Sequence, residues 1–287
     1  MNKFIALAST ISMIFGVGVK GCGSDSSASD SSSSTPINLF STSTSYPSYS
    51  INYSSSSSKK SSSNSSAKSS SSYQTASTSN SLDYSYHYEG DFKFTVWTLN
   101  GSFYYCTVGA KNTTLAGEVD VPSTYGSYPV TYIDYGAFEN CTQLTRLNIP
   151  SSITYISGYA FDKCTKLSSF VVDEDNSAYY SYGGVLYGSR DKSIVKFPAG
   201  KIGSEYTIKS GTEQIESEAF GDTNLVAVNI PTSVTYIGGW VFENALSLTT
   251  IKYSGTKTQW NSIEKFERWN ANSSLTKVEC SNGTIYL

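Results

Sequence analysis

The sequence has 287 residues, of which 15% are charged, and a formal net charge of −3 at pH 7. So small a net charge gives no long-range attraction for nucleic acid or for anionic membrane surfaces, which argues against both as partners bound through charge. The composition changes sharply along the chain, so its parts are best considered separately.

The first 21 residues have the pattern of a secretory signal peptide of the lipoprotein type. Lys3 supplies a positive charge, and the apolar stretch over residues 4–19 is too short and too rich in glycine to span a bilayer comfortably. The segment Val19-Lys20-Gly21-Cys22 resembles the lipobox of bacterial lipoproteins, in which the cysteine receives lipid. Lys20 departs from that motif, so ordinary signal-peptidase cleavage that leaves Cys22 as a free thiol stays open. A lipidated Cys22 predicts contact with a membrane through the lipid anchor only.

Residues 22–82 are dominated by serine, with runs at 54–58 and 69–72. Such a segment cannot bury enough apolar surface to offset the entropy of the chain, so we predict a disordered tether. A flexible chain of about sixty residues has a root-mean-square reach on the order of 40 Å. Its scattered lysines are too dilute to bind a polyanion.

Residues 121–253 contain a repeated frame of isoleucine, phenylalanine and leucine. Four copies are visible, and the proline that follows the first and the third copy begins a similar connecting segment, Pro150 to Tyr155 and Pro231 to Tyr236. The repeated positions are Ile133, Ala137, Phe138, Cys141, Leu144, Leu147 and Ile149; Ile156, Ala160, Phe161, Cys164, Leu167, Phe170 and Val172; Ile215, Ala219, Phe220, Leu225, Val228 and Ile230; and Ile237, Val241, Phe242, Leu248, Ile251 and Tyr253.

Each copy ends on apolar residues with a period of two, which predicts a short strand with one buried face. Pro150 and Pro231 lack the N–H that a further ladder bond needs, so they end the strand. The phenylalanine lies in the opposite limb, in an irregular or helical turn. One unit cannot bury its own apolar face, so stacked units are expected to form a curved solenoid with a single continuous core.

This pattern resembles the BspA-like, treponemal-type (class 5) leucine-rich repeat, a family of surface and secreted proteins. The resemblance implies a β-rich leucine-rich-repeat solenoid of short parallel strands with irregular or short helical turns. Residues 173–208 are similar to the degenerate, hairpin-bearing repeat of that family. The third copy departs from the pattern because Thr223 replaces the cysteine and the next leucine comes one residue early.

Both ends of the repeat array need caps. Residues 83–120 are expected to form an N-terminal β cap with a hairpin that turns at Asn100-Gly101. Residues 254–287 are expected to form a C-terminal cap with a short helix and a hairpin around Asn282-Gly283. Thr256 and Gln259 have the spacing of a capping box, and one helical face is expected to carry Trp260, Ile263 and Trp269.

Candidate chemical groups are few. Cys141 and Cys164 share one repeat position; a disulfide between them is conceivable, but parallel inward side chains favour free buried thiols. Cys106 and Cys280 fall in opposite caps, and no cysteine or histidine spacing suggests zinc.

The sole histidine, His87, lies at the tether boundary, where we expect no serine or cysteine partner. The acidic segment 173–176 has two interpretations, a Ca²⁺ loop and a solvated turn, and its irregular spacing favours the turn. No catalytic residue, metal site or cofactor is therefore predicted.

Two surfaces are candidates for binding. The resemblance to leucine-rich repeats implies that side chains between the inward residues of the repeat strands line the concave face. A second ladder, of tyrosines, precedes the buried isoleucines. The first set is Arg146, Asn148, Ser169, Val171, Ala227, Asn229, Thr250 and Lys252, and the second is Tyr132, Tyr155 and Tyr236.

The resemblance, the signal and the tether together predict a secreted, lipid-anchored, non-enzymatic cell-surface protein of adhesin type. Its partner is expected to be a protein or a glycan, in host extracellular matrix or on neighbouring cells, and not a nucleic acid. Two alternatives stay open: a passive envelope protein that associates with itself, and a hydrolase on a repeat scaffold.

Overall fold

The computed structural model describes residues 81–287. The predicted signal peptide, Cys22 with its predicted lipid, and residues 22–80 of the predicted tether lie outside these residues, whereas Leu82, the last tether residue, begins strand β1. Within the described part, no helix combines the length and the apolar character that a membrane crossing requires.

The N-terminal end is an antiparallel sheet that continues into the first repeat. Strands β1 (Leu82–Glu89), β2 (Phe92–Leu99) and β3 (Ser102–Ala110) pair in order, and β3 then pairs in parallel with β6 (Tyr128–Ile133). Strand β5 (Thr124–Tyr125) folds back on β6, and β8 (Tyr155–Ile156) continues the sheet. The predicted turn at Asn100-Gly101 is confirmed, with both residues at positive φ.

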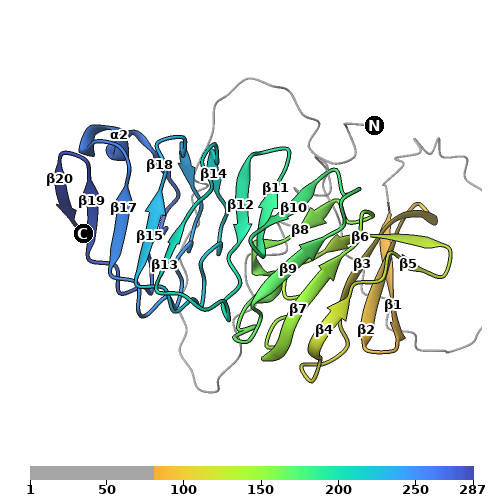
Figure 1. Cartoon of the computed structure of the whole chain (residues 1–287). Helices are drawn as coiled ribbons and strands as arrows, with labels where there is room; N and C mark the ends of the chain where they lie inside the picture. The colour runs from red at the N-terminus through yellow and green to blue at the C-terminus, as the bar shows by residue number, and fades with distance from the viewer. Residues whose placement is uncertain (1–80) are drawn as a thin grey trace, which may run out of the picture. The chain divides into compact units, whose positions relative to one another are not determined.

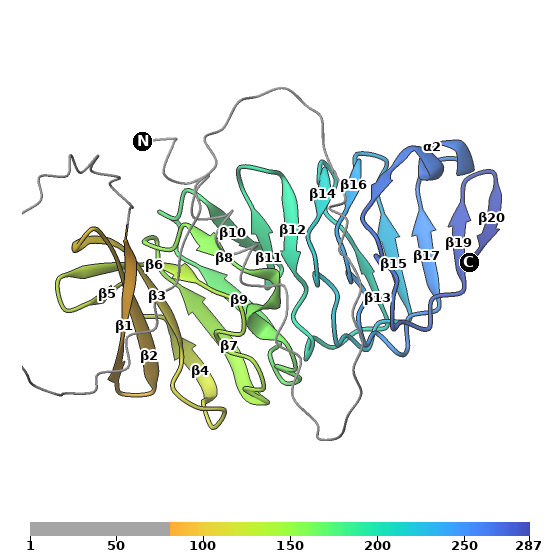
Figure 2. The same cartoon turned by 180° about the vertical axis from the view of Figure 1, so that it is seen from behind.

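The repeats build one long ladder in two parts. Strands β4 (Ala116–Asp120), β7 (Gln143–Ile149) and β9 (Ser169–Val172) are parallel neighbours. Strands β13 (Glu205–Thr207), β15 (Ala227–Ile230), β17 (Thr250–Tyr253) and β19 (Lys277–Cys280) form the second part (Figures 1 and 2). The predicted solenoid of short parallel strands is therefore confirmed.

The opposite limb carries a second ladder that the sequence pattern did not predict. It contains β14 (Gln214–Ile215), β16 (Tyr236–Ile237) and β18 (Glu264–Lys265), each two residues long and parallel to the next. The limb of the second copy also contains one turn of 3₁₀ helix, η1 (Gly158–Phe161). The isoleucine that begins each repeat thus belongs to a strand.

A three-stranded antiparallel segment, which we call the hairpin, interrupts the repeats. It is made of β10 (Tyr179–Tyr182), β11 (Val185–Gly188) and β12 (Ser193–Lys196), and β12 pairs in parallel with β14. Every residue of β11 and β12 is buried. Alternate side chains of these two strands face opposite ways: Leu186 and Val195 join the N-terminal core, while Tyr187 and Ile194 join the C-terminal core.

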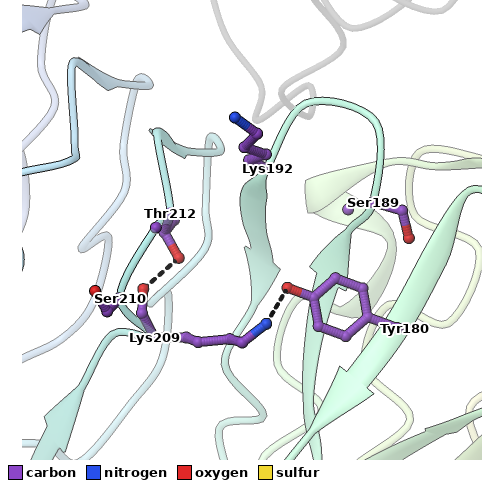
Figure 3. A pocket seen from close by; sticks show the side chains of 8 residues that line it. Tyr180, Ser189, Lys192, Lys209, Ser210 and Thr212 are labelled. Atoms are coloured by element: carbon purple, nitrogen blue, oxygen red, sulfur yellow. Dashed lines mark hydrogen bonds between the residues drawn. The ribbon is translucent and has the colours of Figure 1, made fainter.

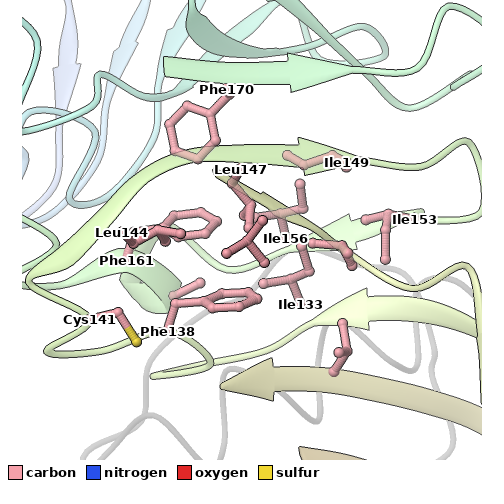
Figure 4. Packing of buried hydrophobic residues seen from close by; sticks show 14 of the residues in the cluster. Ile133, Phe138, Cys141, Leu144, Leu147, Ile149, Ile153, Ile156, Phe161 and Phe170 are labelled. Atoms are coloured by element: carbon pink, nitrogen blue, oxygen red, sulfur yellow. The ribbon is translucent and has the colours of Figure 1, made fainter. Parts of the chain in front are cut away.

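The core therefore consists of two clusters, and the expectation of a single continuous column is wrong. Phe138 stacks on Phe161 in one cluster (Figure 4), with ring centroids 5.9 Å apart. In the other cluster, Phe220 stacks between Phe197 and Phe242. A hairpin whose two faces are both apolar separates the clusters, because period-two alternation directs neighbouring side chains to opposite sides.

The C-terminal cap differs in detail from the prediction. Helix α2 (Lys257–Ser262) is six residues long, and the capping box of Thr256 and Gln259 is confirmed. Ile263 is the C-cap and Trp269 lies in a later turn, so the single helical face is wrong, although Trp269 still packs edge-on against Trp260 at 5.8 Å. The final hairpin pairs β19 with β20 (Gly283–Tyr286). Its turn residues are Ser281 and Asn282, one position earlier than expected, because Gly283 pairs with Cys280.

Candidate functional site

The predicted concave-face residues fall into two groups, one on each part of the long ladder. Arg146 lies beside Ser169 and Asn148 beside Val171, in register on β7 and β9. On β15 and β17, Asn229 lies beside Lys252, and Ala227 lies beside Thr250.

Two of these residues are not available at the surface. Ala227 and Thr250 are only 6% and 7% exposed, so their assignment to the open face is wrong. Both are short side chains, and the longer Glu205 and Lys277 flank them in register on the neighbouring strands. A short side chain between two long ones contributes little to the outer surface.

The remaining polar groups bind to one another. Arg146 forms an ion pair with Glu118 at 3.3 Å, and the Asn148 amide donates to Asp120 at 2.6 Å. In the second group, Glu205 accepts from Asn229 and from Lys252, each at 2.7 Å. The hydrogen bonds from Lys252 and Asn229 lower the pKa of the Glu205 carboxyl. These acidic partners on β4 and β13 were missed because neither strand carries the full repeat pattern.

The tyrosine ladder is longer than predicted, and it runs toward the N-terminus. Tyr132 lies 5.3 Å from Tyr155, as the ladder requires, and ring contacts continue from Tyr132 to Tyr105 at 4.6 Å. Tyr105 stacks on Trp97 at 5.6 Å, and Trp97 contacts Tyr84 at 4.9 Å. We call these five residues, Tyr84, Trp97, Tyr105, Tyr132 and Tyr155, the aromatic stripe.

Tyr236 does not join the aromatic stripe. Its neighbours in register are Gln214 and Glu264, and the hairpin separates its ladder from β8. Trp97 and Tyr105 were missed because the alternation of β2 and β3 was interpreted as cap packing alone, and Tyr84 was missed because it precedes the predicted hairpin, in strand β1.

The aromatic stripe is apolar, neutral and graded in exposure. Tyr84 is 52% exposed, Trp97, Tyr132 and Tyr155 are half-buried, and Tyr105 is buried. Burial raises the pKa of the Tyr105 hydroxyl well above its usual range and that of Tyr132 to about 12, so both hydroxyls are neutral at physiological pH. Rings with a polar tip and a broad apolar body suit a surface that another molecule covers.

A shallow pocket lies next to the hairpin (Figure 3). Its volume is about 170 Å³ and its lining includes Tyr180, Lys192, Lys209 and Thr212. The Lys209 ammonium donates to the Tyr180 hydroxyl at 3.3 Å and also lies 4.8 Å from the centre of that ring. Small-molecule sites usually occupy about 300–1,000 Å³, so this pocket is small for such a ligand.

His87 does have a serine neighbour, and the contrary expectation is wrong. Within β1, the Ser85 hydroxyl lies 2.8 Å from His87 Nε2 because residues two apart on a strand share a face. The imidazole also packs 5.0 Å from the Tyr125 ring. Ser85 is exposed on an edge strand, without the enclosed setting of a nucleophile site.

The acidic segment 173–176 contains a structural asparagine. Asn176 is 8% exposed and donates to the carbonyl oxygens of Pro150 and Ile153, while its own oxygen accepts from the N–H groups of Ala178 and Tyr179. Within residues 81–287, no three histidine, cysteine, aspartate or glutamate side chains gather as a metal site requires.

The predicted free thiols are confirmed at Cys141 and Cys164, and Cys106 and Cys280 are free as well. Burial raises the pKa of Cys106 and of Cys141 to about 11 and that of Cys164 to about 12. Neutral, buried thiols of this kind are unreactive.

Stacked parallel strands, buried phenylalanines stacked between successive turns and two capped ends define a leucine-rich-repeat solenoid. The chain belongs to the family described as BspA type leucine rich repeat region, which it matches in 6 copies over residues 99–203 and 199–287. Membership indicates a repeat-built surface or binding role.

Solved structures of bacterial leucine-rich proteins are similar to this chain at low identity. A leucine rich cell surface protein from Faecalibacterium prausnitzii is 16% identical, with 63% of this chain and 97% of that chain covered and a TM-score of 0.33. A leucine-rich repeat protein from Eubacterium ventriosum is 17% identical, with coverage of 70% and 78% and a TM-score of 0.35. The leucine rich repeat protein of T. pallidum is 22% identical, with coverage of 51% and 63% and a TM-score of 0.30. No curated protein matches the chain.

Proposed function

We propose that the chain is a cell-surface binding protein of adhesin type that captures a protein partner on the aromatic stripe. The single observation that supports this choice is the unbroken series of ring contacts from Tyr84 to Tyr155 across five strands. Family membership supports the general role but selects no partner.

The aromatic stripe suits a protein partner better than the polar face does. Tyrosine and tryptophan dominate binding hot spots because they present a large contact area with few rotatable bonds. The polar groups at Arg146, Asn148 and Asn229 are already bonded to neighbouring side chains. A partner on that face would have to break these bonds before it formed its own.

The test is binding of the full chain to extracellular-matrix protein and to epithelial cells. Tyr84→Ser and Tyr155→Ser are each expected to weaken binding by about thirtyfold, the loss typical of a hot-spot residue. Tyr286→Ser is the matched control because Tyr286 is 81% exposed at the other end of the solenoid. Arg146→Glu is expected to leave binding unchanged.

Three outcomes would contradict the proposal. Binding that ignores both stripe substitutions would exclude the stripe as the site. Binding that survives protease treatment of the target but not removal of its glycans would assign the ligand to carbohydrate. Concentration-dependent assembly in light scattering, without binding to any target, would favour a passive envelope protein.

We also propose that Cys22 carries the lipid that holds the protein at the surface. Labelled palmitate should enter the wild-type chain and not the Cys22→Ala variant. Labelling that persists in Cys22→Ala would rule out this anchor.

A further inference from the structure

The hairpin-bearing repeat makes a shorter turn than its neighbours. Phe197 follows Ile194 by three positions, whereas Phe161 follows Ile156 and Phe220 follows Ile215 by five. With the turn shortened, the limbs on either side of it touch: a Cβ on Gly158 would lie 2.2 Å from the carbonyl oxygen of Ser217. Glycine at 158 therefore permits a contact that skips one repeat.

Lys196 occupies the space beside this shortened turn. Its side chain is 2% exposed, and its ammonium donates to the backbone oxygen of Glu218 at 2.6 Å. The same nitrogen lies 4.0 Å from Asp162 Oδ1. Where other copies carry alanine or valine one residue before the phenylalanine, this copy places an amine within the protein interior.

Two carboxyl oxygens near this amine lack a hydrogen-bond partner among the described residues. They are Oδ1 of Asp162 and Oε1 of Glu218, and both are buried. Glu218 as a whole is only 3% exposed. Gly221 lies beside both groups. A Cβ at this position would be 2.3 Å from Glu218 Oε2 and 3.4 Å from Lys196 Nζ. The carboxyl group and the amine therefore border the same small space.

Burial and neighbouring negative charge raise the pKa of both acids. Burial raises the pKa of Asp162 to about 6, against the opposing effect of Lys196. Burial, a hydrogen bond with Glu243 and the charge of Asp162 raise the pKa of Glu218 well above the usual range, against the effect of Lys196. Glu218 is therefore an acid that still holds its proton at neutral pH.

We propose that Lys196 and Asp162 are joined by an intramolecular amide bond and that Glu218 transfers the protons of this reaction. An amine, a carboxyl group that accepts it and a second, protonated carboxyl group are held together, with the Lys196 side chain 2% exposed and the Asp162 side chain 26% exposed. Fixed proximity of this kind is what allows an otherwise slow condensation to proceed.

The step balances without any added reactant. The Lys196 ammonium first passes one proton to the Asp162 carboxylate. The resulting amine attacks Cγ of Asp162 and forms the N–C bond. Glu218 donates a proton to the Asp162 oxygen that leaves and regains one from the nitrogen. The Cγ–O bond breaks and one water departs. Of the three ammonium hydrogens, one stays on the amide and two leave in the water, and nothing is oxidised or reduced.

The bond would join the two halves of the solenoid. Asp162 follows Phe161 of the N-terminal cluster, whereas Lys196 precedes Phe197 of the C-terminal cluster. The hairpin is the layer between these clusters, so a covalent link here closes the boundary at which they would otherwise separate.

The test is mass spectrometry of the full chain, purified folded and digested after denaturation. The peptides that contain Asp162 and Lys196 should appear as one branched species whose mass is lower than their sum by one water. In Asp162→Asn the leaving group becomes ammonia, so the loss should change from the mass of water to that of ammonia. Two separate, unmodified peptides in the wild-type chain after prolonged incubation would overturn the proposal.

Variants separate the amide from other dehydrations. A succinimide at Asp162 also loses water but needs only the following backbone nitrogen, so the loss should vanish in Lys196→Arg; a loss that persists there would overturn the proposal. Glu218→Gln should slow bond formation at least tenfold, with Glu213→Gln, whose side chain is partly exposed and pairs with Lys192, as the unchanged control. If Glu218→Gln does not fold, the branched peptide of Asp162→Asn, with its loss of ammonia instead of water, still tests the proposal.

Discussion

The ring of Phe220 lies between those of Phe197 and Phe242, with centroid distances of 5.7 Å and 5.6 Å. All three rings are at most 2% exposed. Each turn of this half of the solenoid therefore depends on the ring of the turn before it.

Removal of the central ring should weaken both contacts at once. Phe220→Ala is expected to lower the free energy of unfolding by about 3–5 kcal/mol, because a buried cavity replaces the ring. Urea unfolding measures the change. Tyr286→Ala, at an exposed position, should change stability by less than about 0.5 kcal/mol. Equal effects of the two substitutions would contradict the stacked core.

Asn176 should be as important as a core residue, although it is polar. Asn176→Ala is expected to cost about 3 kcal/mol or more, because it leaves two buried carbonyl oxygens and two N–H groups without their partner. Asp175→Ala next to it removes only an exposed side chain and serves as the control in thermal unfolding. A cost below about 1 kcal/mol would show that water replaces the amide.

Lys163 lies in a left-handed backbone conformation that the first and fourth copies assign to asparagine and the third copy to Asp222. Its φ is 59°, and the equivalent Asn140, Asn244 and Asn272 have φ of 61°, 57° and 54°. Asparagine tolerates the left-handed region better than lysine does, so Lys163→Asn should stabilise the fold by about 0.5–1 kcal/mol. The reverse change, Asn140→Lys, should destabilise by a similar amount in urea unfolding. A stabilisation by Asn140→Lys would contradict this explanation.

The buried thiols should make stability fall at alkaline pH. Burial raises the pKa of Cys164 from 9.0 to about 12, so the folded chain keeps a proton that the unfolded chain releases. This contribution is complete below pH 9 and is lost as the pH rises toward 12. Cys164→Ala should therefore reduce the decline by up to about 1.4 kcal/mol per pH unit.

Urea midpoints at pH 8, 9 and 10 measure this dependence, since these values bracket the ordinary thiol pKa of 9.0. Cys280→Ala is the control, because Cys280 is partly exposed and should contribute a smaller change. A decline unaltered in Cys164→Ala would show that other groups, such as the buried tyrosines, carry the effect.

Local spacing was sufficient for several features of the fold. The repeated Ile-x-x-x-Ala-Phe and Leu-x-x-h-x-h frames predicted the parallel strands, because apolar residues with a period of two need one buried face. The turn at Asn100-Gly101 and the capping box at Thr256 also depend only on near neighbours. The helical face drawn through Trp269 failed because the short strand β18 interrupts it.

The candidate site was only partly predictable. Tyr132 and Tyr155 were placed together because they occupy one position in adjacent repeats, yet the stripe extends through Trp97 and Tyr105 of the cap. Alternation alone predicted that Ala227 and Thr250 face outward, but both are buried between longer residues that lie beside them in register.

By itself, the sequence determined a repeat solenoid, because its spacing requires each unit to bury an apolar face against the next. Only the tertiary structure decided where that stacking is interrupted. The hairpin divides the core, and the shortened turn brings Lys196 next to Asp162, 34 positions earlier in the chain. Local patterns cannot place such a pair, because the distance between the two side chains is set by how separate turns pack, not by their spacing in the sequence.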